Sequence, residues 1–149
     1  MKRMGVEFTF VDPDCSDEEL EAAFRPNTKA VFGETIANPA LIVFDIERFA
    51  NAAHAHGVPL IVDNTFATPI NCRPIEWGAD IVTHSTTKYM DGHDATVGGA
   101  IVDSGKFDWM AHADKFPDSP HLMSHITEWY TQRSSARAAH ISTRSWHSL

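Results

Sequence analysis

The sequence predicts an α/β fold built on a mainly parallel sheet. Short apolar strands alternate with helices along the chain, an order that favours parallel strands joined by right-handed crossovers. The unbroken apolar run at 59–62 is typical of a parallel strand that is covered on both faces. The 149 residues are 43% apolar and 21% charged, which suits one globular domain.

The first elements are predicted from a short alternating run and a helix start signal. Residues 7–11 (EFTFV) are expected to form a strand. Ser16 and Glu19 have the spacing of a capping box, which begins a helix that Pro26 stops. A buried strand at 30–32 follows and ends near Gly33.

The clearest helix begins after Asp45, whose side chain can cap it. Its apolar residues at 46, 49, 50 and 53 recur with helical spacing, and Gly57 ends it as a left-handed cap. The elements expected after it are strands at 59–62, 79–83 and 99–102, with a short helix at 74–77 that stops at Gly78.

Charge and hydropathy exclude several functions. The formal charge of −8 argues against a nucleic-acid-binding surface, which is usually basic. The longest apolar run, 40–44, is far shorter than the ~20 residues of a membrane span. We expect no targeting segment, and the two unpaired-looking cysteines, Cys15 and Cys72, favour the reducing cytoplasm.

Polar side chains follow two of the predicted strands. Asp63 comes directly after one strand, and Ser85, Thr87 and Lys88 follow the next. Because ligands of open parallel sheets bind outside the carboxyl ends of the strands, these side chains could face one crevice. An acid, two hydroxyls and a lysine suit pyridoxal 5′-phosphate, which has a basic ring nitrogen, a phosphate and an aldehyde. Taken singly, each residue also fits a loop, a cap or a solvated surface.

The same residues carry a family resemblance. The segments 63–69 (DNTFATP), 78–89 (GADIVTHSTTKY), 92–93 and 98–99 closely resemble the pyridoxal-phosphate enzymes of cysteine and methionine metabolism. These include cystathionine synthases and lyases, methionine gamma-lyase and O-acetylhomoserine sulfhydrylase. Residues 34–40 and 99–109 look most like the sulfhydrylase branch. The resemblance covers residues 2–117 and implies part of the large, mainly parallel-sheet domain of aspartate-aminotransferase-like enzymes.

The resemblance implies a role for each matching residue. Lys88 would hold the cofactor as a Schiff base and later move protons, and Asp63 would pair with the pyridine nitrogen. Ser85 and Thr87 would bind the phosphate.

Two further residues match the family pattern around the ring. Asn38 matches the asparagine beside the 3-oxygen of the ring, and Thr65 matches a residue packed close to it. Asn38 before a proline is also a natural turn pair. His93 could belong to the site or only stabilise its loop.

The implied reaction is trans-sulfuration. Sulfide or a thiol would replace the γ-acetate of O-acetylhomoserine, a small amino-acid substrate, giving homocysteine or methionine. A γ-lyase, a γ-synthase or a non-catalytic remnant of such an enzyme are the alternatives. Relatives of full length are expected to be homotetramers that share sites between subunits. A metal site made of His54, His56, His84 and His93 is disfavoured, because no pair has zinc-like spacing.

We expect the fold to be incomplete and the isolated fragment to be inactive. Residues 2–5 are typical of the last turn and cap of a helix without a body, and the family pattern stops after residue 117. Residues 118–149 are therefore expected to be an aberrant tail from a lost reading frame. The first 120 residues hold 9 basic and 19 acidic residues, whereas 121–149 hold three arginines and one glutamate. A half-covered sheet and marginal stability would follow.

Overall fold

The computed structural model describes residues 5–93 and 95–117. The chain divides into two compact units, Met1–Phe107 and Asp108–Leu149, and the first contains the helices and strands described here. The expectations for residues 2–4 and for the tail at 118–149 lie outside the described residues.

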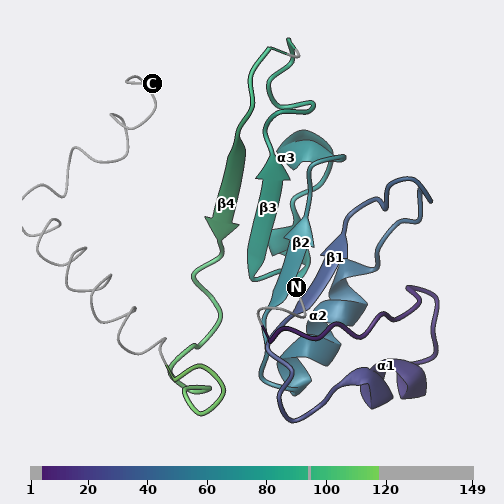
Figure 1. Ribbon diagram of the computed structural model, residues 1–149, viewed down its shortest axis with the longest axis vertical. Helices are drawn as coiled ribbons and strands as arrows, with labels where there is room; N and C mark the ends of the chain where they lie inside the picture. The colour runs from purple at the N-terminus through teal and green to yellow at the C-terminus, as the bar shows by residue number, and fades with distance from the viewer. Residues whose placement is uncertain (1–4, 94, 118–149) are drawn as a thin grey trace, which may run out of the picture. The chain divides into compact units, whose positions relative to one another are not determined.

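A four-stranded sheet forms the centre of the first unit. Its strands are β1 (Val31–Glu34), β2 (Leu60–Asp63), β3 (Ile81–Ser85) and β4 (Gly99–Asp103), and they lie side by side in that order. The first three run parallel, and their arrows point the same way in Figure 1. β4 runs antiparallel to β3. The predicted α/β fold with a mainly parallel sheet is confirmed.

The two predicted main helices form with the predicted start signals. α1 (Asp17–Ala23) begins at a complete capping box, in which the Ser16 hydroxyl accepts from the Glu19 N–H at 3.2 Å and the Glu19 carboxylate accepts from the Ser16 N–H at 3.0 Å. α2 (Ile46–Ala55) begins where the Asp45 carboxylate accepts from the Arg48 N–H at 3.0 Å.

Two glycines end elements as predicted, because both adopt the left-handed conformation that residues with a side chain avoid. Gly57, with φ of 63°, follows α2. Gly78, with φ of 100°, ends the 3₁₀ helix η2 (Pro74–Trp77).

One local expectation was wrong, and one short helix was not predicted. Residues 7–11 form no strand, because the segment pairs with no other strand, and Phe10 is 93% exposed. A short helix, α3 (Thr68–Asn71), was not predicted, although Pro69 in its first turn is a usual start signal.

The core lies between α2 and one face of the sheet. Leu60 and Val62 alternate along β2 toward this face and are fully buried against the apolar side of α2, where Phe49, Ala50 and Ala53 are also buried. The other members of the core are Leu20, Ile46, Val58, Ala79 and Val82.

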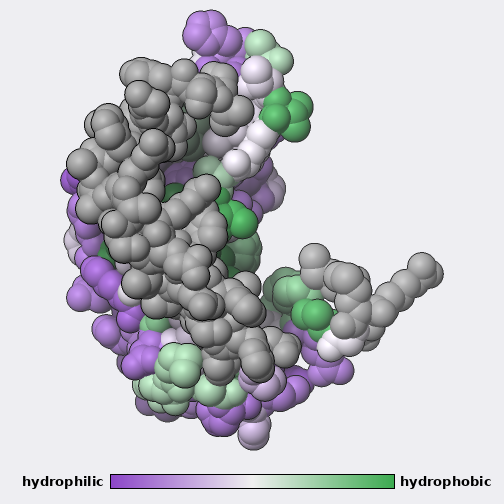
Figure 2. All heavy atoms as spheres, turned by 90° about the vertical axis from the view of Figure 1, so that its left-hand side faces the viewer, coloured by the Kyte–Doolittle hydropathy of each residue, from purple (hydrophilic) through white to green (hydrophobic). Residues whose placement is uncertain are grey.

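The opposite face of the sheet is only partly covered. The strand register places Phe32, Ile61, Ile81 and Ile101 on this face, and Phe32 is 61% and Ile101 78% exposed. Figure 2, a view from the side of β4, shows hydrophobic residues at the surface beside hydrophilic ones. No described helix is long and apolar enough to cross a membrane.

Candidate active site

The carboxyl ends of the parallel strands meet at a cavity of about 810 Å³. This is within the size range of ligand sites, and the place is the one that open α/β sheets use. The cavity is lined by Glu34, Ile36, Asn38, Asp63, Thr65, Phe66, Ser85, Lys88, Tyr89, Gly92 and His93. Of the six residues predicted from the sequence, all but Thr87 line it.

Asp63 is the last residue of β2 and is held in place by the turn that follows. Its carboxylate accepts a hydrogen bond from the Thr65 N–H at 2.8 Å. The register pairs Asp63 with Glu34 of β1 and Thr83 of β3, so the three lie in one row across the sheet. The row places the Asp63 carboxylate on the partly covered face, opposite α2.

Thr65 connects the ends of the two central strands. Its hydroxyl oxygen accepts from the Ser85 N–H at 2.7 Å, which ties the turn after β2 to the last residue of β3. This bond sets the distance between the part of the site that carries Asp63 and the part that carries Ser85. Thr65 therefore has a structural role of its own, besides lining the cavity.

Lys88 lies in the turn that follows β3. Its N–H donates to the carbonyl of Ser85 at 3.3 Å, so one turn of backbone separates the hydroxyl from the amine. Lys88 is exposed and lines the cavity together with the carboxylates of Glu34 and Asp63. The cavity thus combines a primary amine, two acids and a hydroxyl.

Thr87 lies outside the cavity lining. Its hydroxyl donates to the carbonyl of Gly98 at 3.2 Å and accepts from the Gly98 N–H at 3.0 Å. These bonds fasten the lysine turn to the segment that enters β4. The phosphate-binding role of Thr87 stays a prediction.

Glu34 is a cavity residue that the sequence analysis missed. It ends β1 as Asp63 ends β2, and one carboxylate oxygen accepts from the Asn38 N–H at 3.0 Å. This bond shapes the loop that carries Asn38, whose bond to Pro39 is cis. The rule that polar residues at strand ends line ligand sites could have found Glu34.

Two rings and a buried hydrogen-bond chain were also missed. Phe66 and Tyr89 meet edge to face, 5.7 Å apart, at the cavity wall. Asn64, fully buried behind Asp63, accepts from the Thr35 hydroxyl at 2.8 Å and donates to the Cys72 carbonyl at 2.8 Å. These hydrogen bonds hold Asn64, and with it the neighbouring Asp63, in place.

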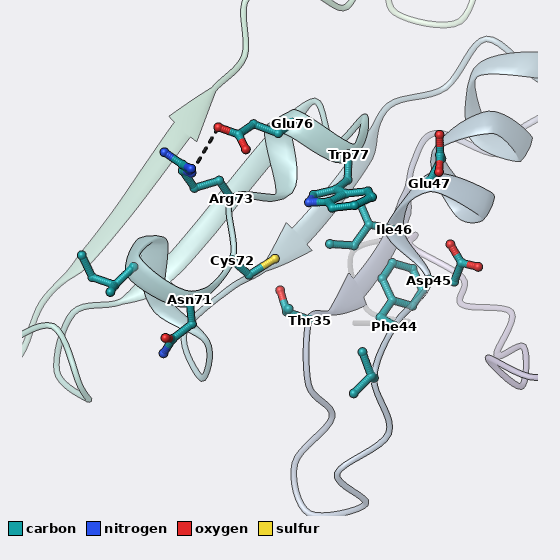
Figure 3. Close-up of a pocket in the computed structure, with 12 residues that line it drawn as sticks. Thr35, Phe44, Asp45, Ile46, Glu47, Asn71, Cys72, Arg73, Glu76 and Trp77 are labelled. Carbon is teal, nitrogen blue, oxygen red and sulfur yellow. Dashed lines mark ion pairs between the residues drawn. The ribbon is translucent and has the colours of Figure 1, made fainter.

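A second cavity of about 440 Å³ lies on another part of the first unit (Figure 3). Among its described lining residues Arg73 is the one cation, and it is paired with Glu76 at 3.1 Å. Burial, followed by the charge of Glu76, raises the pKa of the Cys72 thiol, which disfavours the reactive thiolate. No described lysine or histidine lines this cavity, so we place the chemistry in the larger one.

Two histidines of the disfavoured metal site are engaged by different acids. His54 Nε2 lies 2.8 Å from the buried carboxylate of Asp80, and His56 Nε2 lies 2.6 Å from Glu21. Within residues 5–93 and 95–117 no three histidine, cysteine or acidic residues are grouped to hold a metal ion.

The comparisons with known proteins agree with this geometry. The family model of the Cys/Met metabolism PLP-dependent enzymes matches residues 1–136. The chain belongs to this family. It is 54% identical over 117 residues to the homocysteine/cysteine synthase of Saccharomyces cerevisiae, covering 78% of the chain and 26% of that protein. It is 45% identical over 124 residues to the O-acetyl-L-homoserine sulfhydrylase of Corynebacterium glutamicum, covering 83% and 28%.

Solved structures show the same fold. Cystathionine gamma-lyase from Lactobacillus plantarum, complexed with L-serine, matches with a TM-score of 0.65 and 43% identity over 68% of this chain and 26% of that one. A putative O-acetylhomoserine (thiol)-lyase from Campylobacter jejuni, which contains N′-pyridoxyl-lysine-5′-monophosphate, matches with 0.67 and 36% identity over 71% and 26%. The chain therefore spans about a quarter of the length of its relatives.

The cavity fits the cofactor of this family. Pyridoxal phosphate needs an amine for its aldehyde and a carboxylate for its ring nitrogen, and Lys88 and Asp63 line one cavity. Ser85 would offer a hydroxyl to the phosphate, and the wall of Phe66 and Tyr89 would offer apolar surface to the ring.

Proposed function

We propose that the chain binds pyridoxal 5′-phosphate in the 810 Å³ cavity and serves γ-replacement on O-acetylhomoserine. Sulfide or a small thiol replaces acetate, giving homocysteine or methionine. The single observation that carries this proposal is that Lys88 lines one cavity with Asp63 and Ser85. The named relatives with homocysteine synthase and sulfhydrylase activity support the choice of substrate.

Each residue has a distinct task in this proposal. The bound cofactor supplies an electron sink for the substrate's α carbon. Lys88 Nζ would hold the cofactor through its aldehyde and, once freed by the substrate amine, would accept the α proton. The Asp63 carboxylate keeps a proton on the ring nitrogen, in the position that its bond from the Thr65 N–H fixes.

The remaining residues orient the cofactor. Ser85 donates its hydroxyl to the phosphate, and charge-assisted bonds of this kind are roughly twice as strong as neutral ones. Thr87 is assigned to the phosphate as well, once its hydroxyl exchanges Gly98 for that group. Asn38 would lie beside the 3-oxygen of the ring, and Thr65 would pack close to the ring, since both line the cavity.

Turnover separates the proposal from its alternatives. Against the expectation of an inactive isolated fragment, this proposal predicts that the purified chain forms homocysteine from O-acetylhomoserine and sulfide when pyridoxal phosphate is added, and that Lys88→Ala abolishes this. Release of a ketoacid and ammonia would instead favour γ-elimination, which the likeness to a cystathionine gamma-lyase makes the second candidate. If the intact chain forms neither product, the non-catalytic remnant is the alternative that remains.

We also propose that the protein is cytoplasmic and that it associates as we expect of its full-length relatives, as a homotetramer in which subunits share sites. The unpaired state of Cys15 and Cys72 among the described residues supports a reducing compartment. The exposed apolar side chains of the partly covered sheet face support association. Light scattering of the purified chain tests the assembly, and a monodisperse monomer would contradict it.

A further inference from the structure

His93 lines the same cavity as Lys88 and belongs to a strongly bonded loop. The Asp91 N–H donates to the carbonyl of Thr86 at 2.9 Å, which anchors the loop to the end of β3. The Asp91 carboxylate in turn accepts from the N–H groups of His93 at 3.3 Å and Ala95 at 2.9 Å, and from the Thr96 hydroxyl. The place of His93 at the cavity is therefore set by several hydrogen bonds, although its side chain is exposed.

The contacts of the ring determine which nitrogen carries the proton. Nδ1 of His93 lies 3.2 Å from the carbonyl oxygen of Asp91. A carbonyl only accepts hydrogen bonds, so Nδ1 must be the protonated nitrogen of the neutral ring. Nε2 then keeps a free lone pair, and no described residue bonds to it.

Among the titratable residues that line the cavity, His93 is left without a role by the function proposed above. In the function proposed above, Lys88 and Asp63 serve the cofactor and the α proton. Glu34 accepts the hydrogen bond that shapes the loop before Pro39. The phenol of Tyr89 is a hydrogen-bond donor near neutral pH rather than a base.

The reaction also needs a base that accepts the proton of the sulfur nucleophile. The nucleophile in sulfur chemistry is the thiolate or hydrosulfide and not its protonated form. Imidazole is the side chain that changes charge between about pH 5 and 8, the range in which such a proton must be accepted.

We propose that Nε2 of His93 accepts the proton of the sulfur nucleophile in this cavity. The S–H bond breaks, its electron pair stays on sulfur, and the proton forms the second N–H bond of an imidazolium. The resulting ion pair holds the anionic sulfur close to the reacting carbon. This inference rests on the proposed function, because it assigns the base for that reaction.

The negative charge of Asp91, which is bonded to His93, supports this proposal. The hydrogen bond from the Thr96 hydroxyl, followed by that from the Ala95 N–H, lowers the pKa of the Asp91 carboxyl. Asp91 thus stays ionised near neutral pH, so the loop can keep its bonds when the His93 ring accepts a proton. The other charged groups that line the cavity are Lys88, Glu34 and Asp63.

Nitrogen NMR of the chain labelled with ¹⁵N-histidine tests the proposal without turnover. The pyridoxal-phosphate-loaded chain is titrated with pH in sodium sulfide and, as the control, in sodium chloride of equal ionic strength. In chloride, the neutral ring of His93 should carry its proton on Nδ1. In sulfide, the midpoint of its titration should rise by about one pH unit, because an adjacent anion stabilises the imidazolium.

An internal control is present in the same spectrum. The ring of His54, already bonded to Asp80, should titrate alike in both salts. In turnover with sulfide, His93→Gln should slow the reaction by about 100-fold at low pH, and the deficit should shrink at higher pH, where sulfide ionises unaided. Its Lys88-dependent absorption band should remain.

The outcomes distinguish this proposal from the proposed function. If the band with pyridoxal phosphate forms but sulfide leaves the His93 midpoint unmoved, or the neutral ring carries its proton on Nε2, this proposal alone is overturned. If no band forms that Lys88→Ala removes, the proposed function fails and the assignment of the base fails with it.

Discussion

Replacing Asn64 should cost more stability than any exposed asparagine, because two buried groups lose their partners. Asn64 is fully buried; it accepts from the hydroxyl of Thr35, itself 5% exposed, and donates to the carbonyl of Cys72. An unsatisfied buried polar group costs about 1–3 kcal/mol. Because Cys72 is only half-buried, water can reach its carbonyl, so that group counts at the low end. For Asn64→Ala we expect the free energy of unfolding to fall by about 2–4 kcal/mol.

Urea unfolding followed by circular dichroism measures this change, with an unchanged m-value showing that the unfolded state is the same. Asn51→Ala, at an exposed position of α2, is the matched control and should change stability by less than about 0.5 kcal/mol. A double-mutant cycle with Thr35→Val should give a coupling of about 0.5–3 kcal/mol. The reasoning is refuted if Asn64→Ala costs no more than Asn51→Ala.

Three further expectations concern packing, thiol reactivity and pH. Gly33→Ala should destabilise the chain by about 1–3 kcal/mol, because its new Cβ would lie 2.7 Å from the ring of Phe44. Adding Phe44→Leu to this variant should recover part of the lost stability in thermal unfolding. If no stability is recovered, the clash lies elsewhere. Burial and, after it, the charge of Glu76 raise the pKa of the Cys72 thiol, so iodoacetamide should alkylate this thiol slowly near neutral pH. Glu76→Gln should speed the alkylation severalfold. An unchanged rate would show that the charge of Glu76 does not hold back the thiol. The lowered pKa of Asp91 means that the stability contributed by its loop bonds is fully present above the pKa of the unfolded chain and is lost as pH falls through the lower folded value. The ¹³C shift of the Asp91 carboxyl carbon should therefore stay nearly constant from pH 7 to about 5, and a protonation step there would contradict the assignment.

Local signals along the chain predicted most helices and strands. The capping box at Ser16 and the left-handed positions of Gly57 and Gly78 depend on a few neighbouring residues, so the sequence alone was enough. The run at 7–11 has strand-like alternation, but a strand also needs a partner with free hydrogen-bonding groups. None of the described strands pairs with it, and sequence cannot show that.

The site was predictable where it follows the ends of parallel strands. Asp63, Ser85 and Lys88 were found by that rule together with the family resemblance, and all three line one cavity. The contacts of Thr87 with Gly98 could not be predicted, because they depend on β4 returning antiparallel to β3. The bond between Asn64 and Thr35 was missed because the two residues are 29 apart in sequence and meet only once β1 and β2 pair.

Trapping the cofactor on the chain tests the central claim most directly. The chain is mixed with pyridoxal phosphate and reduced with borohydride, which turns a Schiff base into a stable amine, and its peptides are then mapped by mass spectrometry. The exposed Lys106 serves as an internal control for random labelling. The account predicts a pyridoxyl group on Lys88 in large excess over Lys106, and weaker labelling of Lys88 in Asp63→Ala. Equal labelling of the two lysines, unaffected by Asp63→Ala, would contradict it.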